Sequence, residues 1–398
     1  MRVCIFFITL VSGVLCYSQS QTLLIARNTG KKVMEDGKVI TTMGYAKKLS
    51  QNPDIPGPTL EYFEGDSVTI DLWNVSQGAP HTIHLHGLDV DQQNDGVPHL
   101  SFVVEHMEHG FYKFKAPHPG TYLYHCHVVS SIHVQAGMYG LLIIKPKNAP
   151  NQTWVDGYTF SSDYNFIFSE IDSVWHHDSV LEHSANHKRV PIPAYNPSYF
   201  LANGKSNGQL DSSEVSLIKG KYSYLRLANI GYYGNLIRFP QDIDVLIIDS
   251  DGRPLPEPIK SNSLYIFPGE RYGVLIKSLQ VSADSIEVDY LDLNTLKSKG
   301  RLSINYSVAD NSAVSEISKT GLKIYPNPTN EKVFIDLQEN QVKDIQVFDV
   351  NGKQVTIKVS YDADKALSIN AVHWNAGMFL IQVVYQNGQT SYHRLLKY

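Results

Sequence analysis

Short runs of alternating residues constrain the fold of this 398-residue chain more than any other feature. Valine, isoleucine, threonine and tyrosine recur in these runs, and clusters of glycine, proline, asparagine and aspartate separate them. This pattern is typical of β-strands joined by turns. No segment shows the period of an amphipathic helix of any length. The sequence therefore predicts an all-β fold, and its length predicts two or three domains, each with its own core.

The runs fall into three blocks. Residues 19–148 contain strand-like segments such as LEYFEGDSVTIDLWN and GTYLYHCH, with turns at PGP, NDG and HPG, and this spacing predicts a Greek-key sandwich. Residues 149–309 repeat the pattern in YSYLRLANIG and LYIFPGERYGVLIK. A polar segment, 310–320, is predicted to be a linker. Residues 321–398 are predicted to form a small set of strands with two Asn-Gly turns.

The N-terminus has the layout of a secretory signal peptide over residues 1–18. Arg2 precedes an apolar run that is too short to span a bilayer comfortably, and small residues follow it. Cys4 and Cys16 lie in this region, so its removal would leave Cys126 as the only thiol. An unpaired thiol in an exported protein is either an inert buried side chain or a metal ligand.

Histidines cluster around that cysteine, because ten of the sixteen lie between His81 and His133. Residues two apart on a strand share a face. Each of the two His-x-His pairs therefore presents both imidazoles to one side, and the cysteine inside the second pair points to the other side. Parity predicts two sites. The first contains His84, His86, His125 and His127. The second contains His81 and Cys126, and His133 and Met138 on the following loop can complete it.

The mixed set predicts copper. Two imidazoles, one thiolate and a weak thioether are the ligands of a blue-copper electron-transfer centre. Zinc is the competing metal, since a cysteine with several histidines also suits it. Structural zinc rarely uses methionine, however, and zinc would leave the four-imidazole set unexplained.

Several motifs resemble those of multicopper oxidases and their two-domain relatives. They are PGPTLEYFEGDSVTIDLWN, HTIHLHGL, NDGVPH, GTYLYHCH and HVQAGMYG, and YFLANGK, LRLANIG and FPGERYGVLI in the second block are similar to strands of the same family. The resemblance covers about residues 50–280 and implies two cupredoxin-like sandwiches. It implies that the first strand supplies His81 to a type 1, His84 to a type 2 and His86 to a type 3 copper. It implies that the second strand and its loop add type 3 ligands His125 and His127 and type 1 ligands Cys126, His133 and Met138.

The chain departs from the family pattern in two ways. Cys126 and His133 are seven residues apart, which is longer than in most three-domain laccases and shorter than in copper nitrite reductases. A trinuclear cluster in the family takes eight histidines from two domains, whereas the first block supplies four. The second block has no His-x-His pair and offers only a polar segment. Its histidines are His176, His177, His183 and His187.

The last block resembles the C-terminal sorting domain of the type IX secretion system. The matching features are YPNP, the FDVNGK hairpin, the GMFLIQV strand and the terminal basic KY. This resemblance implies recognition by the type IX machinery and a final location outside the outer membrane, either secreted or at the cell surface.

These observations together predict an exported, copper-dependent oxidoreductase. A phenolic or metal-ion donor would be oxidised at a type 1 copper, coupled to dioxygen reduction, in a homo-oligomer that is expected to be a trimer. A nitrite reductase-like enzyme and a non-enzymatic copper-binding electron-transfer protein are the alternatives. The formal charge of -5 and a pI near 6.3, with no basic run, argue against nucleic acid as a partner.

Overall fold

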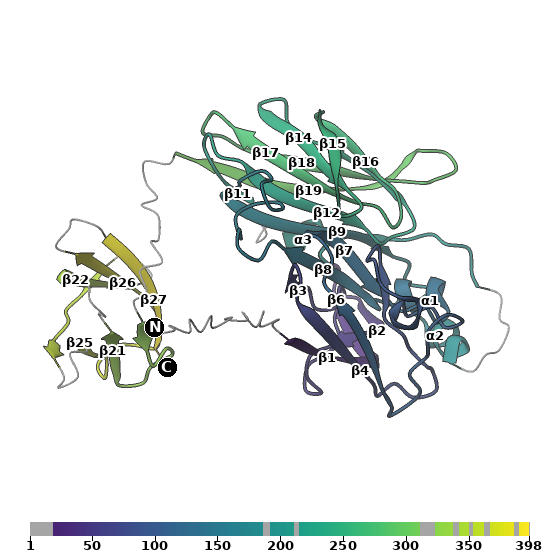
Figure 1. Ribbon diagram of the computed structural model, residues 1–398, viewed down its shortest axis with the longest axis horizontal. Coiled ribbons are helices and arrows are strands. Elements are labelled where there is room, and N and C mark those ends of the chain that lie inside the picture. The colour runs from purple at the N-terminus through teal and green to yellow at the C-terminus, as the bar shows by residue number, and fades with distance from the viewer. Residues whose placement is uncertain are drawn as a thin grey trace, which may run out of the picture. The chain divides into compact units, whose positions relative to one another are not determined.

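The computed structural model describes residues 19–185, 192–210, 215–310, 323–336, 342–349, 353–361, 367–385 and 390–397. The predicted signal peptide and all of the predicted linker except its first residue lie outside them. The chain divides into two compact units, residues 1–309 and 310–398. Strands dominate both units, which confirms the all-β prediction (Figure 1).

The first unit begins with a sandwich of two four-stranded sheets, ordered β2-β1-β4-β6 and β3-β8-β7-β5. Alternation fixes the inward faces: in β4, Val68, Ile70 and Leu72 are buried and the residues between them are partly exposed. The bounds are β1 Gln19–Val33, β2 Val39–Ala46, β3 Leu60–Phe63, β4 Ser67–Asn74, β5 His84–His86, β6 His109–Lys115, β7 Gly120–His125 and β8 Tyr139–Lys145. A 3-10 helix, Gln92–Asn94, precedes β6, and helix α1, Ser130–Gln135, connects β7 to β8.

A second, larger sandwich follows, with sheets ordered β10-β9-β12-β17-β14-β15 and β11-β19-β18-β13-β16. The bounds are β9 Ser162–Ile171, β10 Tyr199–Ala202, β11 Val215–Ile218, β12 Ser223–Asn229, β13 Gly234–Arg238, β14 Ile243–Ser250, β15 Arg253–Lys260, β16 Ser263–Ile266, β17 Arg271–Ser278, β18 Ala283–Leu291 and β19 Ser298–Ala309. Helix α2, Asp178–Ala185, lies beside α1 (Figure 1), and α3 is a single turn, Asn207–Leu210. None of the helices in the described part of the chain has the length and apolar character needed to span a membrane. The exact domain boundaries stay predictions.

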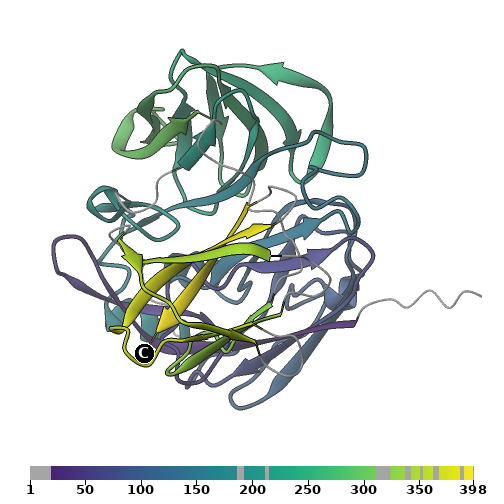
Figure 2. The same ribbon diagram turned by 90° about the vertical axis from the view of Figure 1, so that its left-hand side faces the viewer.

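The two sandwiches of this unit share a packed interface. All six residues of β7 are buried, because one face of the strand lines the core of the first sandwich and the other lies against β12 and β17. An apolar cluster joins residues of both sandwiches. It contains Leu123, Val134, Tyr139 and Leu141 from the first and Ile167, Ile171, Leu201 and Ile230 from the second. Figure 2 shows the same two sandwiches turned by 90°. The strand that carries the His-Cys-His motif therefore depends on the second domain for half of its packing.

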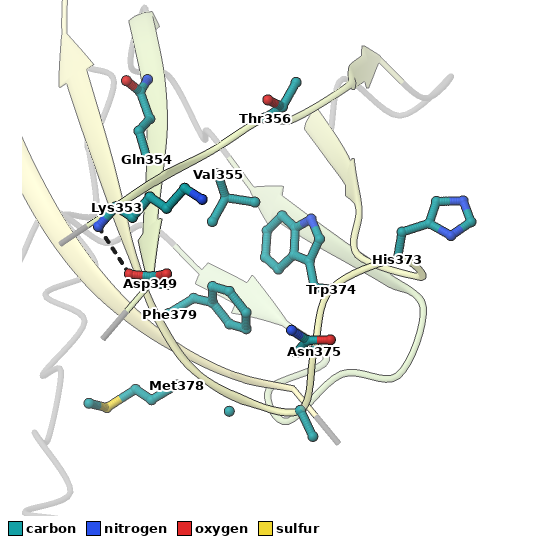
Figure 3. A pocket seen from close by; sticks show the side chains of 12 residues that line it. Asp349, Lys353, Gln354, Val355, Thr356, His373, Trp374, Asn375, Met378 and Phe379 are labelled. Atoms are coloured by element: carbon teal, nitrogen blue, oxygen red, sulfur yellow. Dashed lines mark hydrogen bonds between the residues drawn. The ribbon is translucent and has the colours of Figure 1, made fainter. Parts of the chain in front are cut away.

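The second unit is a small sandwich with sheets ordered β20-β21-β25-β24 and β23-β22-β26-β27. The bounds are β20 Lys323–Tyr325, β21 Lys332–Asp336, β22 Val342–Asp349, β23 Gln354–Val355, β24 Val359–Tyr361, β25 Leu367–Asn370, β26 Gly377–Tyr385 and β27 Thr390–Lys397. Figure 3 shows a cavity of about 490 Å³ in this unit, where Trp374 packs on Phe379 with ring centroids 4.7 Å apart. The buried residues form one core of their own, which includes Val333, Ile369 and Ile381.

Candidate metal centre

The first candidate site, the Cys126 site, comprises His81, Cys126, His133 and Met138. The cysteine follows β7, His81 pairs with Val104 in an isolated bridge, and His133 lies on α1. The Nδ1 atoms of His133 and His81 lie 3.3 Å and 3.7 Å from the Cys126 sulfur. All three residues are fully buried, and their three ligand atoms lie within 4.8 Å of one another. The structure therefore brings His81, which is 45 residues from Cys126 in the sequence, to the thiol and to His133, which is seven residues from it.

Backbone hydrogen bonds close the loop from the cysteine to the methionine. Cys126 N–H donates to the carbonyl of Met138 at 3.0 Å, and Met138 N–H donates to the carbonyl of His133 at 2.9 Å. Met138 is fully buried in the same apolar cluster as Cys126. Gly137 has a φ of 115°, and a Cβ there would lie 2.8 Å from the Met43 carbonyl oxygen, so the turn before Met138 requires glycine. The loop thus brings the backbone of Met138 beside that of Cys126, with the Met138 side chain buried.

Burial sets the protonation states of this site. It raises the pKa of the Cys126 thiol to about 11, lowers that of His133 to about 4, and lowers that of His81 well below its usual value. Both imidazoles are therefore neutral near pH 7 and have lone pairs available, whereas the thiol keeps its proton unless a cation displaces it. Two neutral imidazole nitrogens and a thiol aimed at one point, with a buried methionine beside them, fit copper.

The second candidate site, the four-histidine site, comprises His84, His86, His125 and His127. Strands β5 and β7 are antiparallel, and their register places His84 opposite His125. The His84 ring centroid lies 5.1 Å from that of His125, 5.3 Å from that of His127 and 5.7 Å from that of His86. The ligand atoms of His84, His86 and His125 lie within 4.8 Å of one another. The imidazoles that parity assigned to one face thus converge.

Hydrogen bonds to backbone oxygens orient these rings. His84 Nδ1 lies 2.8 Å from the carbonyl of Asp95 and 3.5 Å from its carboxylate, and His125 Nδ1 lies 3.0 Å from the carbonyl of Cys126. Both residues therefore keep Nε2 for a metal. His125 Nε2 lies 3.3 Å from His86 Nδ1. Burial lowers the pKa of His125 to about 3 and, together with the charge of Arg271, that of His86 to about 4, so these two rings are neutral.

Residues of the second domain pack against the His86 ring. Gly269, in the turn between β16 and β17, approaches the ring so closely that a Cβ there would lie 3.4 Å from His86 Nε2. Arg271 donates to the Gly269 carbonyl at 2.7 Å and pairs with Asp251 at 2.8 Å. Its guanidinium also occupies the space where a Cβ on Gly87 would lie. Sequence reasoning missed this support, because nothing near the histidines predicts which residues of a distant domain will face them.

The histidines of the second block lie elsewhere. His176 is buried, and its Nδ1 lies 2.7 Å from the carbonyl of Thr41 on β2. His177 is exposed, and both line a small pocket with Lys38 and Asp178. The side chain of His183 and the whole of His187 lie outside the described residues. Among the described residues, two groups of His, Cys, Asp or Glu side chains have metal-ligand spacing, and they are His81, Cys126 and His133, and His84, His86 and His125.

Comparisons with known proteins agree with this arrangement. Two profiles of the multicopper oxidase family match residues 34–149 and 167–288, and a secretion system C-terminal sorting domain matches residues 323–397. The first match spans all eight candidate ligands.

Related proteins include an L-ascorbate oxidase from Cucurbita pepo var. melopepo, 27% identical over 256 residues, which are 58% of this chain and 44% of the relative. Copper resistance protein A from Pseudomonas syringae pv. tomato is 42% identical over 100 residues, which are 25% of this chain and 16% of the relative. The chain spans less than half the length of the curated relatives it matches. Among solved structures, a blue copper oxidase from Nitrosomonas europaea is 27% identical with a TM-score of 0.60, covering 76% of this chain and 89% of that one. The chain thus belongs to the multicopper oxidase family, whose cofactor is copper, and carries a secretion-system sorting domain at its C-terminus.

Proposed function

We propose that this protein is an exported copper oxidase that removes single electrons from a phenolic or metal-ion donor and passes them to dioxygen. In this proposal His81, Cys126, His133 and Met138 hold a type 1 copper. His84 holds a type 2 copper, and His86, His125 and His127 hold type 3 copper. Copper supplies the one-electron redox chemistry, and the protein supplies ligand geometry, burial and the route between the sites.

The observation that carries the proposal is the position of Cys126 between the two sites. Its sulfur belongs to the Cys126 site, while its covalent neighbours His125 and His127 belong to the four-histidine site. Its carbonyl also accepts the hydrogen bond from His125 Nδ1. An electron that enters at the thiolate therefore has a short path through bonds to the second site. Four such electrons and four protons convert one dioxygen to two waters, and the donor is oxidised in four one-electron steps.

The four-histidine site favours a closed homo-oligomer, for which a trimer is our proposal. Four imidazoles are half of the eight that a trinuclear cluster of the family needs. His84 and His86 remain partly exposed, although the chain's own Gly269 and Arg271 cover one side. A head-to-tail ring would bring another subunit to the open side and satisfy closed cyclic symmetry. The described histidines of the second domain lie at β2, so the interface is expected to hold fewer coppers than a full cluster.

The test is copper per subunit, measured together with the mass of the oligomer in solution. We expect a trimer with two or three coppers per chain and oxygen uptake when phenols or reduced metal ions are added under air. The matching assay with nitrite under argon is expected to be negative. A stable monomer with one copper per chain and no oxygen uptake would instead support the electron-transfer alternative.

Arg271→Gln is expected to weaken the four-histidine site while sparing the Cys126 site. The variant loses the bond to the Gly269 carbonyl and the pairing with Asp251, so the turn that packs against the His86 ring loses its anchor. Loss of such an outer-shell partner lowers metal affinity or activity about 10–100-fold. Oxygen uptake should fall by that factor while the visible band of the Cys126 site stays. Arg253→Gln is the matched control, because Arg253 bonds Tyr122 across the same domain interface and touches none of the four histidines. Equal losses in both variants would mean that the effect is general destabilisation.

A further inference from the structure

Residues of the second domain form hydrogen bonds with α1, the short helix that carries His133. Gln135, at the end of α1, is buried, and all polar atoms of its side chain are engaged. Its Nε2 donates to the backbone carbonyl of Glu170 at 2.9 Å and to the hydroxyl of Tyr195 at 3.0 Å. Its Oε1 accepts from the backbone N–H of Asp172 at 2.8 Å. A residue two positions after His133 is thus fixed to the end of β9.

Glu170 takes part in most of these hydrogen bonds, directly or through a tyrosine. Its carboxylate is almost fully buried, and Oε1 accepts from the hydroxyl of Tyr195 at 2.9 Å and from the backbone N–H groups of Tyr232 and Tyr233. The hydroxyl of Tyr232 in turn donates to the carbonyl of Ser131, at the start of α1. Both ends of the helix are therefore connected to one buried carboxylate of the second domain.

The charge of this carboxylate changes in the neutral pH range. Burial raises the pKa of Glu170 to about 7, although its hydrogen-bond donors lower it. The phenols that face it have pKa values raised chiefly by burial and stay neutral. They are Tyr139 on β8, Tyr195 in the segment after α2, Tyr232 and Tyr233 after β12, and Tyr290 on β18. Asp172 is the other acid beside these tyrosines, and its carboxylate accepts from the backbone N–H groups of Val174 and Asn196.

We propose that Glu170 is a positioning residue for the Cys126 copper site. Glu170 holds His133 in place through Gln135, and its negative charge lowers the reduction potential of the copper. The proposal rests on the type 1 role proposed above for the Cys126 site. A buried negative charge stabilises the more positive, oxidised copper, since the interior screens it weakly. Protonation of Glu170 removes that charge and raises the potential. By linkage, a copper held at the Cys126 site would take up an electron together with a fraction of a proton, which solvent would supply to the Glu170 carboxylate as its proton affinity rises.

The sign of the pH dependence follows from the raised pKa. Below the pKa, Glu170 is neutral and the potential is high. As the pH rises through about 7, the carboxylate forms and the potential falls.

The experiment is a redox titration of the copper-loaded full chain, followed at its visible band between about pH 6 and pH 8. Wild type is expected to show a potential that falls with pH. Glu170→Gln keeps the shape and removes the charge, so its potential should equal the low-pH value of wild type at every pH. Glu287→Gln is the matched control, because this β18 glutamate is held by Ser285 and Ser303 in the sheet far from α1, and it should keep the wild-type dependence.

Two further variants separate charge from position. Gln135→Met removes the hydrogen bonds between the Gln135 side chain and the second domain but leaves the charge of Glu170. The visible band should therefore shift or broaden, while the pH dependence of the potential remains. Tyr195→Phe removes a donor to the carboxylate, so the fall in potential should move to higher pH. A pH dependence in Glu170→Gln equal to that of wild type, or an unchanged midpoint in Tyr195→Phe, overturns the charge coupling. An unaltered band in Gln135→Met overturns the positioning role. Absence of any visible band in copper-loaded wild type would instead mean that the proposed function itself is wrong.

Discussion

Cys126→Ser is expected to remove the intense visible band and all donor oxidation from the copper-loaded protein. The band arises from charge transfer between a thiolate and Cu(II), and a hydroxyl does not provide it. Electron entry stops as well, because the sulfur is the atom that links the Cys126 site to the peptide path. The change is nearly isosteric, and a buried hydroxyl without a partner costs about 1–3 kcal/mol. A domain stability of roughly 5–15 kcal/mol tolerates this loss, so the sandwich should stay folded.

The measurement is an absorption and paramagnetic resonance spectrum, with oxygen uptake recorded on the same samples. Tyr62→Phe is the matched control, because Tyr62 is buried in the same apolar cluster and donates to the hydroxyl of Thr22, yet provides no candidate ligand. It should keep the colour and most of the turnover. A copper-loaded wild type that is colourless and tetragonal, or a serine variant that still oxidises donors, would contradict the type 1 role of Cys126.

Truncation after residue 318 is expected to leave the copper sites unchanged and to prevent release of the protein from the cell envelope. Residues 310–398 form a compact unit with a core of their own, so we expect the first unit to fold without them. The matched sorting domain implies that this unit is what the export machinery recognises. Cell fractionation and copper content of the purified truncated chain give the two readouts.

A point variant provides a control for that truncation. Ile381→Asp places a carboxylate in the fully buried core of the small sandwich, and an unpaired charge there should unfold that unit alone. It should be retained in the envelope like the truncated chain and should keep the visible band. Loss of copper in both variants would mean that the tail contributes to the copper sites, whereas normal export of both would mean that it is an ordinary accessory domain.

The convergence of the histidines was predictable because it depends on strand parity. Two pairs with a spacing of two, on antiparallel strands, can meet on one face only, and β5 and β7 pair in the register that allows it. The structure also places His81 and His133 beside the Cys126 sulfur, while the ligand roles of these residues and of Met138 stay predictions. The family and the fold are the parts that the comparisons confirm.

The contacts of the second domain were not predictable in this way. Arg271 is 185 positions from His86 in the sequence, by subtraction of their numbers, and Glu170 is 35 positions from Gln135. The residues that Arg271 and Glu170 contact are set by how the two sandwiches pack, and no sequence periodicity encodes that packing.

One local signal of the second layer existed in the sequence. The stretch GTYLYH is buried along its whole length, as expected for a strand covered on both faces, and an apolar-aromatic run of this kind indicates a second packed layer. The histidines at 176 and 177 show the limit of composition as a guide, because His176 is bonded to β2 instead of facing the cluster.

The burial of β7 on both faces has a consequence for the order of assembly. The strand pairs with β5 and β8 in its own sandwich, yet its outer face is completed by β12, which is synthesised about 100 residues later, and by β17, which is synthesised about 150 residues later. Until β12 and β17 are synthesised, the outer face of β7, the strand that carries His125, is exposed to water. We therefore expect metal incorporation to be a late event in the biogenesis of this protein, and a truncated first domain to be a poor acceptor of copper.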